Sequence, residues 1–119
     1  MQKENVVYEK AYKFAIKIVK VHKYLAHEKK EYVLAKQLLR SGTSIGANLC
    51  EANGAISRAD FSSKVSLAYK EYLETKYWIS LLKDSDIINE SSFNEIYPGA
   101  DEIGRILLSI LRTTRIKKN

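Results

Sequence analysis

The amino-acid sequence predicts an all-α fold, an up-down-up-down antiparallel four-helix bundle formed by a single domain, residues 1–119. Apolar residues recur at alternating steps of four and three along most of the chain, which is the spacing of a helix packed in a bundle. No stretch has the strict alternation of a β-strand. Five glycines and one proline leave few breaks, and the length of 119 residues suits one ordinary domain.

The first helix is predicted over residues 3–27. Its core seam follows the four-three spacing without interruption and consists of Val7, Ala11, Phe14, Ile18, Val21 and Leu25. A second apolar stripe lies beside this seam and consists of Tyr8, Tyr12, Ile16 and Val19. An apolar arc this wide predicts burial on more than one side, and a second subunit could supply the additional contact.

The remaining arc of the first helix is basic. Lys10, Lys13, Lys17 and Lys20 follow steps of three, four and three, so all four point to the same side. We call these four residues the lysine row. Like charges at such spacings repel one another by a few tenths of a kcal/mol per pair. A solvated face is the usual explanation of a charge run, and an anion-binding face is the alternative; the sequence leaves both open.

The second helix is predicted over residues 32–55. Its apolar seam consists of Leu38, Gly42, Ile45, Leu49, Ala52 and Ile56. Gly42 and Gly46 lie inside this helix, although each glycine costs an exposed helix about 1 kcal/mol relative to alanine. Their presence therefore predicts a close approach of another backbone.

Polar residues beside this seam predict a satisfied polar network that serves folding or assembly. The predicted network consists of Arg40, Asn48 and Glu51 on the second helix and Glu71 and Glu74 on the third, with Arg40, Arg58 or Lys70 as counter-charges.

The third helix is predicted from an N-cap at Ser57 to about residue 83, with Asp60 as the acid of a capping box. Its seam consists of Phe61, Val65, Ala68, Tyr72, Thr75, Ile79 and Leu82. Tyr69 and Trp78 lie off this seam. Together with Tyr8 and Tyr12 of the first helix, they predict a subunit interface, because several aromatic side chains outside a core are typical of one.

The fourth helix is predicted to begin at a cap formed by Asn89 or Ser91. Pro98 falls inside it and is expected to kink or split it, because proline removes a backbone hydrogen bond. The helix resumes at residue 101. Its basic end contains Arg112 and Arg115, which suit a helix C-terminus and also join the candidate anion-binding residues.

No catalytic or metal-binding pattern is found in the sequence. The only histidines are His22 and His27, and neither follows a glutamate by three residues as in di-iron bundles. Cys50 is the only cysteine, has no histidine or aspartate companion, and is predicted to be an inert buried thiol. We therefore expect no metal, no cofactor and no enzymatic activity.

The composition of the chain indicates its compartment and the kind of partner it binds. A single cysteine is typical of a reducing compartment, and no signal peptide or apolar run of about 20 residues is found. We expect a cytoplasmic protein with no membrane partner. The formal net charge of +6 favours an acidic partner such as nucleic acid, although a merely basic soluble domain has the same charge.

Three segments resemble a known family. Residues 37–52 contain Gln-Leu-x-Arg-Ser followed by Ser-Ile-x-Ala-Asn-Leu-x-Glu-Ala. Residues 68–79 read Ala-Tyr-Lys-Glu-Tyr-Leu-Glu-Thr-Lys-Tyr-Trp-Ile, and residues 101–107 read Asp-Glu-Ile-Gly-Arg-Ile-Leu. In order and spacing they resemble the four-helix bundle proteins encoded by intervening sequences in bacterial 23S ribosomal RNA genes. The resemblance covers nearly the whole chain. The related accessory variability proteins of diversity-generating retroelements look like ring-shaped homo-oligomers, pentamers in particular, with basic outer surfaces.

The resemblance and the charge pattern together give two functional hypotheses. In the first, the chain forms a homo-oligomeric ring, a pentamer by resemblance, and binds nucleic acid, RNA rather than DNA. The binding residues would be Lys10, Lys13, Lys17, Lys20, Arg112 and Arg115. In the second, the chain is a homo-oligomeric scaffold whose aromatic stripes form the assembly interface and also bind another protein, and the lysines only keep it soluble.

Overall fold

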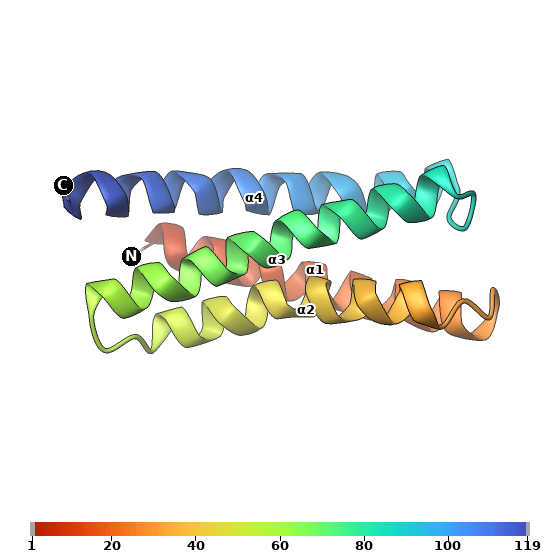
Figure 1. The fold of residues 1–119 in the computed structure, drawn as a ribbon, viewed down its shortest axis with the longest axis horizontal. Helices are drawn as coiled ribbons and strands as arrows, with labels where there is room; N and C mark the ends of the chain where they lie inside the picture. The colour runs from red at the N-terminus through yellow and green to blue at the C-terminus, as the bar shows by residue number, and fades with distance from the viewer. Residues whose placement is uncertain (1, 119) are drawn as a thin grey trace.

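The computed structural model describes the backbone of residues 2–118 and the side chains of residues 5–114, and it contains four helices. They are α1 (Gln2–His27), α2 (Val33–Asn53), α3 (Arg58–Asp84) and α4 (Glu90–Lys118) (Figure 1). No strand occurs within residues 2–118. The prediction of an all-α chain of four helices is confirmed, and the ends of α1, α2 and α3 lie within two residues of those expected.

The four helices lie side by side around one core. Each helix packs against its neighbour in the chain, and α1 also packs against α4; the pairs α1–α3 and α2–α4 make no such contact among the described residues. Figure 1 shows the chain turning back at each short connection, so that the two ends of the chain lie at the same end of the molecule. The result is a rod with principal extents of 47 × 21 × 21 Å.

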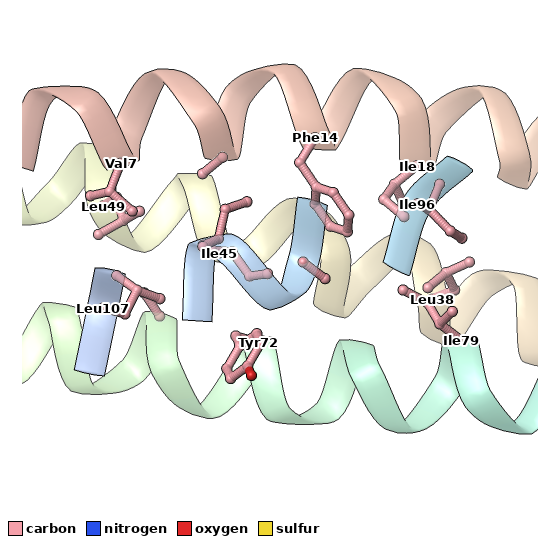
Figure 2. Packing of buried hydrophobic residues seen from close by; sticks show 14 of the residues in the cluster. Val7, Phe14, Ile18, Leu38, Ile45, Leu49, Tyr72, Ile79, Ile96 and Leu107 are labelled. Atoms are coloured by element: carbon pink, nitrogen blue, oxygen red, sulfur yellow. The ribbon is translucent and has the colours of Figure 1, made fainter. Parts of the chain in front are cut away.

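The core is built from the predicted seams. Figure 2 shows side chains from all four helices pointing into the space between them, for example Phe14 and Ile45. On α1 the seam is buried apart from Val21, which is half-buried. On α3 it is buried apart from the half-buried Phe61. Burying apolar side chains of this size contributes about 1.5–3 kcal/mol each, so these seams hold the bundle together.

The glycines of α2 allow α1 to approach closely, as the sequence predicts. A Cβ atom added to Gly46 would lie 3.7 Å from the backbone carbonyl group of Ala11. A Cβ atom on Gly42 would lie 3.0 Å from the γ-carbons of Ile18. Gly42 therefore leaves room for the branched side chain of Ile18, which is fully buried.

The seam of α2 is shorter than predicted. Ile56 is 93% exposed and does not belong to it. The reason is that α2 ends at Asn53 with Gly54 as its C-cap, so Ile56 lies in the connection to α3 rather than on a helical face.

The predicted caps of α3 and α4 are present. The Ser57 hydroxyl accepts a hydrogen bond from the backbone N–H of Asp60 at 3.0 Å. The Asp60 carboxylate accepts one from Ile56 at 3.2 Å, so the capping box is closed one residue earlier than usual. The Asn89 side chain accepts a bond from the backbone N–H of Ser92 at 2.8 Å, which makes Asn89, not Ser91, the cap of α4.

The predicted split of the fourth helix at Pro98 is wrong. The helix α4 runs without a break from Glu90 to Lys118, and its ribbon shows no sharp bend in Figure 1. Pro98 is exposed, while Ile96 and Ala100 on either side of it are fully buried. Because packing fixes both flanking turns against the core, the chain retains the helix despite the missing hydrogen bond.

Among the described residues, no helix has both the length and the apolar character needed to cross a membrane.

Candidate nucleic-acid interface

The lysine row lies on the side of α1 that borders α4, and two of its members are paired there. The ammonium of Lys10 lies 3.2 Å from Glu102 Oε2, and that of Lys17 lies 3.5 Å from Glu95 Oε1. All four of these side chains are at least 40% exposed. Half of the row is thus neutralised by acids of another helix, which the sequence analysis did not foresee.

The other two members of the row have no acid partner. Lys13 and Lys20 are exposed and make no ion pair with another described residue. Lys17 follows Lys10 by seven residues on α1, and its partner Glu95 precedes Glu102, the partner of Lys10, by seven residues on α4. The same register places residue 99, a glycine, opposite Lys13 and residue 92, a serine, opposite Lys20. The Cα atoms of these two lysines are about 10.5 Å apart along the helix axis, at a rise of about 1.5 Å per residue.

A shallow groove of about 160 Å³ lies between the two ion pairs. Its apolar lining is formed by Phe14, Gly99 and Ile103, and its rim includes Lys13. Gly99 keeps this groove open, because a Cβ atom there would lie 3.5 Å from the Phe14 ring. The groove therefore carries charges of both signs around an apolar patch, because the residues of both ion pairs also line it.

Arg112 is not brought together with the lysine row. It is exposed on α4, ten residues after Glu102, which places it about 80° around the helix from the side that faces the row. The side chain of Arg115, the other predicted arginine, lies outside the described residues.

The polar network predicted around α2 exists only in part. Arg40 Nη1 donates to Glu71 Oε1 at 3.2 Å, and Nη2 donates to Glu74 Oε2. The indole N–H of Trp78 donates to the same Glu74 oxygen at 3.0 Å. The pKa of Glu74 is lowered by the bond from Trp78 and then by that from Arg40, while the bond to Glu74 raises the pKa of Arg40. This cluster joins α2 to α3 on a half-exposed face.

The prediction that Asn48 and Glu51 belong to this cluster is wrong. The Asn48 amide donates to the backbone carbonyl of Ser44 on its own helix at 2.9 Å. Glu51 pairs with Lys64 of α3 at 2.8 Å, a bond that raises the pKa of Lys64. Both residues lie one or more turns along α2 from Arg40, so each finds a nearer partner. Neither Arg58 nor Lys70 provides a counter-charge among the ion pairs of the described residues.

The predicted interface aromatics differ in exposure. Tyr12 is 59% exposed, with its ring 6.3 Å from that of Tyr8. Tyr8, Tyr69 and Trp78 are half-buried and pack against the core. Of the four, only Tyr12 therefore leaves most of its surface for another molecule.

Cys50 is exposed, and its prediction as a buried thiol is wrong. It lies on the side of α2 next to Tyr8. Electrostatic interaction with the Cys50 side chain raises the pKa of Tyr8, and burial adds to that effect. Within the described residues, no three or more histidine, cysteine or acidic side chains gather in a way that could hold a metal ion.

Sequence reasoning also missed a cluster that joins α3 to α4. Lys76 Nζ donates to the Tyr72 hydroxyl at 3.2 Å and lies 3.4 Å from Asp101 Oδ1. It sits 5.3 Å above the Tyr72 ring and 5.4 Å above the Tyr97 ring, within cation–π range. The hydrogen bond to Tyr72 is the main cause of a raised Lys76 pKa. Tyr72 and Lys76 are one turn apart on α3, but they meet Asp101 and Tyr97 only when α3 packs against α4, so no local pattern signals the whole cluster.

A family model and a solved structure each match most of this chain. The model of the family described as 23S rRNA-intervening sequence protein matches residues 3–109. A crystal structure of a protein of unknown function from the S23 ribosomal protein family of Bacteroides thetaiotaomicron is 47% identical, with a TM-score of 0.90. The match covers 92% of this chain and 98% of that chain. No curated protein matches the chain.

Proposed function

Because this chain belongs to the 23S rRNA-intervening sequence protein family, we propose that it is a non-enzymatic nucleic-acid-binding protein, directed to RNA rather than DNA. In this proposal the chain is an up-down-up-down antiparallel bundle that assembles into a ring-shaped homo-oligomer, a pentamer by resemblance. The family description, which names 23S rRNA, supports the choice of RNA. The lysine row supports binding through phosphates.

The observation that carries the proposal is the pair of unpaired, exposed lysines on one side of α1. Lys13 and Lys20 lie on the same side of α1 and form no ion pair with another described residue, so their ammonium groups can contact phosphates. Contact with phosphates releases condensed counterions and needs no sequence information. Tyr24 follows Lys20 by one helical turn and is 47% exposed, so it offers one surface on which an unpaired base can stack.

Assembly would make such a small patch effective. Two lysines bind a phosphate backbone weakly, but a ring repeats the patch on every subunit. Once one patch is bound, the others act at a high effective concentration, so avidity can exceed the affinity of one patch by a factor of about 100 or more. The proposal therefore requires an intact oligomer for tight binding.

A titration of structured RNA and of duplex DNA at low and near-physiological salt tests the proposal, on protein whose solution mass is measured. The variant Lys13→Gln/Lys20→Gln should lose most of the binding and remain assembled. The control Lys36→Gln/Lys70→Gln removes the same amount of charge from exposed positions of α2 and α3. This control variant should still bind nucleic acid. Absence of binding by the intact wild-type oligomer at low salt would refute the proposal.

A homo-oligomeric protein-interaction scaffold is the second candidate function. It is favoured by the exposed apolar side chains of Tyr12 and Ile16, which lie one turn apart on α1 outside the core. Under this candidate the double variant Tyr12→Ser/Ile16→Ser should lower the solution mass. Nucleic acid should then bind neither the wild type nor the lysine variants.

A further inference from the structure

We infer that Glu95 and Glu102 of α4 are specificity-determining residues that restrict the lysine row to two phosphate-binding ammonium groups per subunit. The inference rests on the proposed function, because it concerns which lysines a nucleic acid can engage. Its basis is the pairing of Lys10 with Glu102 at 3.2 Å and of Lys17 with Glu95 at 3.5 Å across the boundary between α1 and α4.

The pairing follows from the register of the two helices rather than from a single chance contact. The two lysines are seven residues apart on α1, the two glutamates are seven residues apart on α4, and they meet in opposite order. Seven residues are two helical turns, so both pairs stand on the same side of the α1–α4 boundary. The positions opposite Lys13 and Lys20 carry a glycine and a serine instead of an acid. Paired and unpaired lysines therefore alternate along the row.

A phosphate that approaches Lys10 or Lys17 also approaches the glutamate carboxylate that is paired with that lysine. The side chains of both pairs are at least 40% exposed, so a ligand can reach them, but it must displace or approach a negative charge. Exposed ion pairs of this kind contribute little to stability, so the carboxylate competes with a phosphate without excluding it. Lys10 and Lys17 thus contribute less to binding than Lys13 and Lys20, although the four lysines share one face.

The consequence is selection by the size of the ligand. Because only two lysines of the row are without an ion pair among the described residues, a short anion that reaches the row of one subunit binds weakly. A longer nucleic acid that reaches several subunits gains avidity. Glu95 and Glu102 therefore favour extended phosphate backbones over small polyanions.

Removing the two carboxylates tests this inference. The variant Glu95→Gln/Glu102→Gln should bind an RNA hairpin at least about fivefold more tightly at low salt, since each freed lysine gains a full phosphate contact. The slope of log affinity against log salt should steepen by about 0.7–0.9 for each added phosphate. The control Glu28→Gln/Asp84→Asn raises the net charge equally by removing exposed acids that form no ion pair among the described residues.

The lysine variants give a second, independent arm. Lys10→Gln/Lys17→Gln and Lys13→Gln/Lys20→Gln remove the same charge, but the second variant should lose several-fold more affinity. Equal losses, or equal gains in the glutamate variant and its control, would overturn the inference and leave the proposed function standing. If neither the wild type nor the glutamate variant binds RNA, the proposed function fails, and the inference fails with it.

Discussion

Gly104 on α4 lies against the ring of Tyr72 on α3, and replacing this glycine by alanine should destabilise the bundle. A Cβ atom at Gly104 would lie 2.0 Å from Tyr72 Cζ, 2.3 Å from Cε1 and 2.4 Å from Cε2. Carbon atoms in contact are ordinarily about 3.5–4.0 Å apart, so the ring would have to retreat by about 1.5 Å. Tyr72 is only 6% exposed, and the surrounding core leaves little room for such a movement.

The magnitude follows from three effects. Overpacking a well-filled core costs about 1–3 kcal/mol. Moving the ring also weakens the 3.2 Å hydrogen bond from Lys76 to the Tyr72 hydroxyl, which is worth about 0.5–1.5 kcal/mol. Alanine recovers about 1 kcal/mol because it is the better helix former. We therefore expect Gly104→Ala to lower the free energy of unfolding by about 1–3 kcal/mol.

Urea denaturation followed by circular dichroism measures this change, at one fixed protein concentration so that the comparison does not depend on self-association. The decisive comparison is a double-mutant cycle with Tyr72→Leu, which removes the ring. In that background Gly104→Ala should stabilise by about 1 kcal/mol, through helix propensity alone. A Gly104→Ala protein as stable as the wild type, or the same loss in both backgrounds, would refute the account of this contact.

Three further substitutions test other parts of the fold. Gly46→Ala should raise the free energy of unfolding by about 0.5–1 kcal/mol in urea, since the new Cβ atom would meet its neighbours at an ordinary 3.7 Å. Pro98→Ala should stabilise by up to about 3 kcal/mol, because it restores a helical hydrogen bond at an exposed position; an unchanged urea midpoint would contradict this. Trp78→Phe removes the hydrogen bond to Glu74 and should raise the pKa of Glu74 in a carboxyl NMR titration. Because that pKa is lowered in the folded protein, its stabilising contribution is full above the unfolded pKa and is lost as the pH falls through the folded value. Trp78→Phe should therefore lessen the loss of stability in acid.

The fold could be predicted closely because its signals are local. The four-three seams and the Ser57 cap can be recognised from residues within one or two helical turns. The glycines of α2 can also be recognised within their own helix, although the residues that pack on them come from α1. The errors lie where packing or a helix end overrides the local pattern. Pro98 remains helical because buried residues hold both flanking turns, and Ile56 leaves the seam because α2 ends three residues earlier.

The candidate site was less predictable, because its charges are decided by contacts between helices. The spacing of the lysine row placed its members on one side of α1, but it could not reveal that Lys10 and Lys17 face acids of α4. The seven-residue spacing of Glu95 and Glu102 was a usable signal, since it matches that of the two lysines. For the same reason, Asn48 was wrongly expected to join the network around Arg40. A residue's position beside a seam does not determine which side chain of the next helix it contacts.

Lysine footprinting tests whether nucleic acid contacts α1 through Lys13 and Lys20. The full chain is acylated with and without a saturating structured RNA, and the modification rate of each lysine is read by mass spectrometry. We predict that RNA lowers the modification rates of Lys13 and Lys20 and leaves the modification rates of Lys36 and Lys70 unchanged. Unchanged rates at Lys13 and Lys20 while RNA is bound, or protection confined to Lys36 and Lys70, would contradict it.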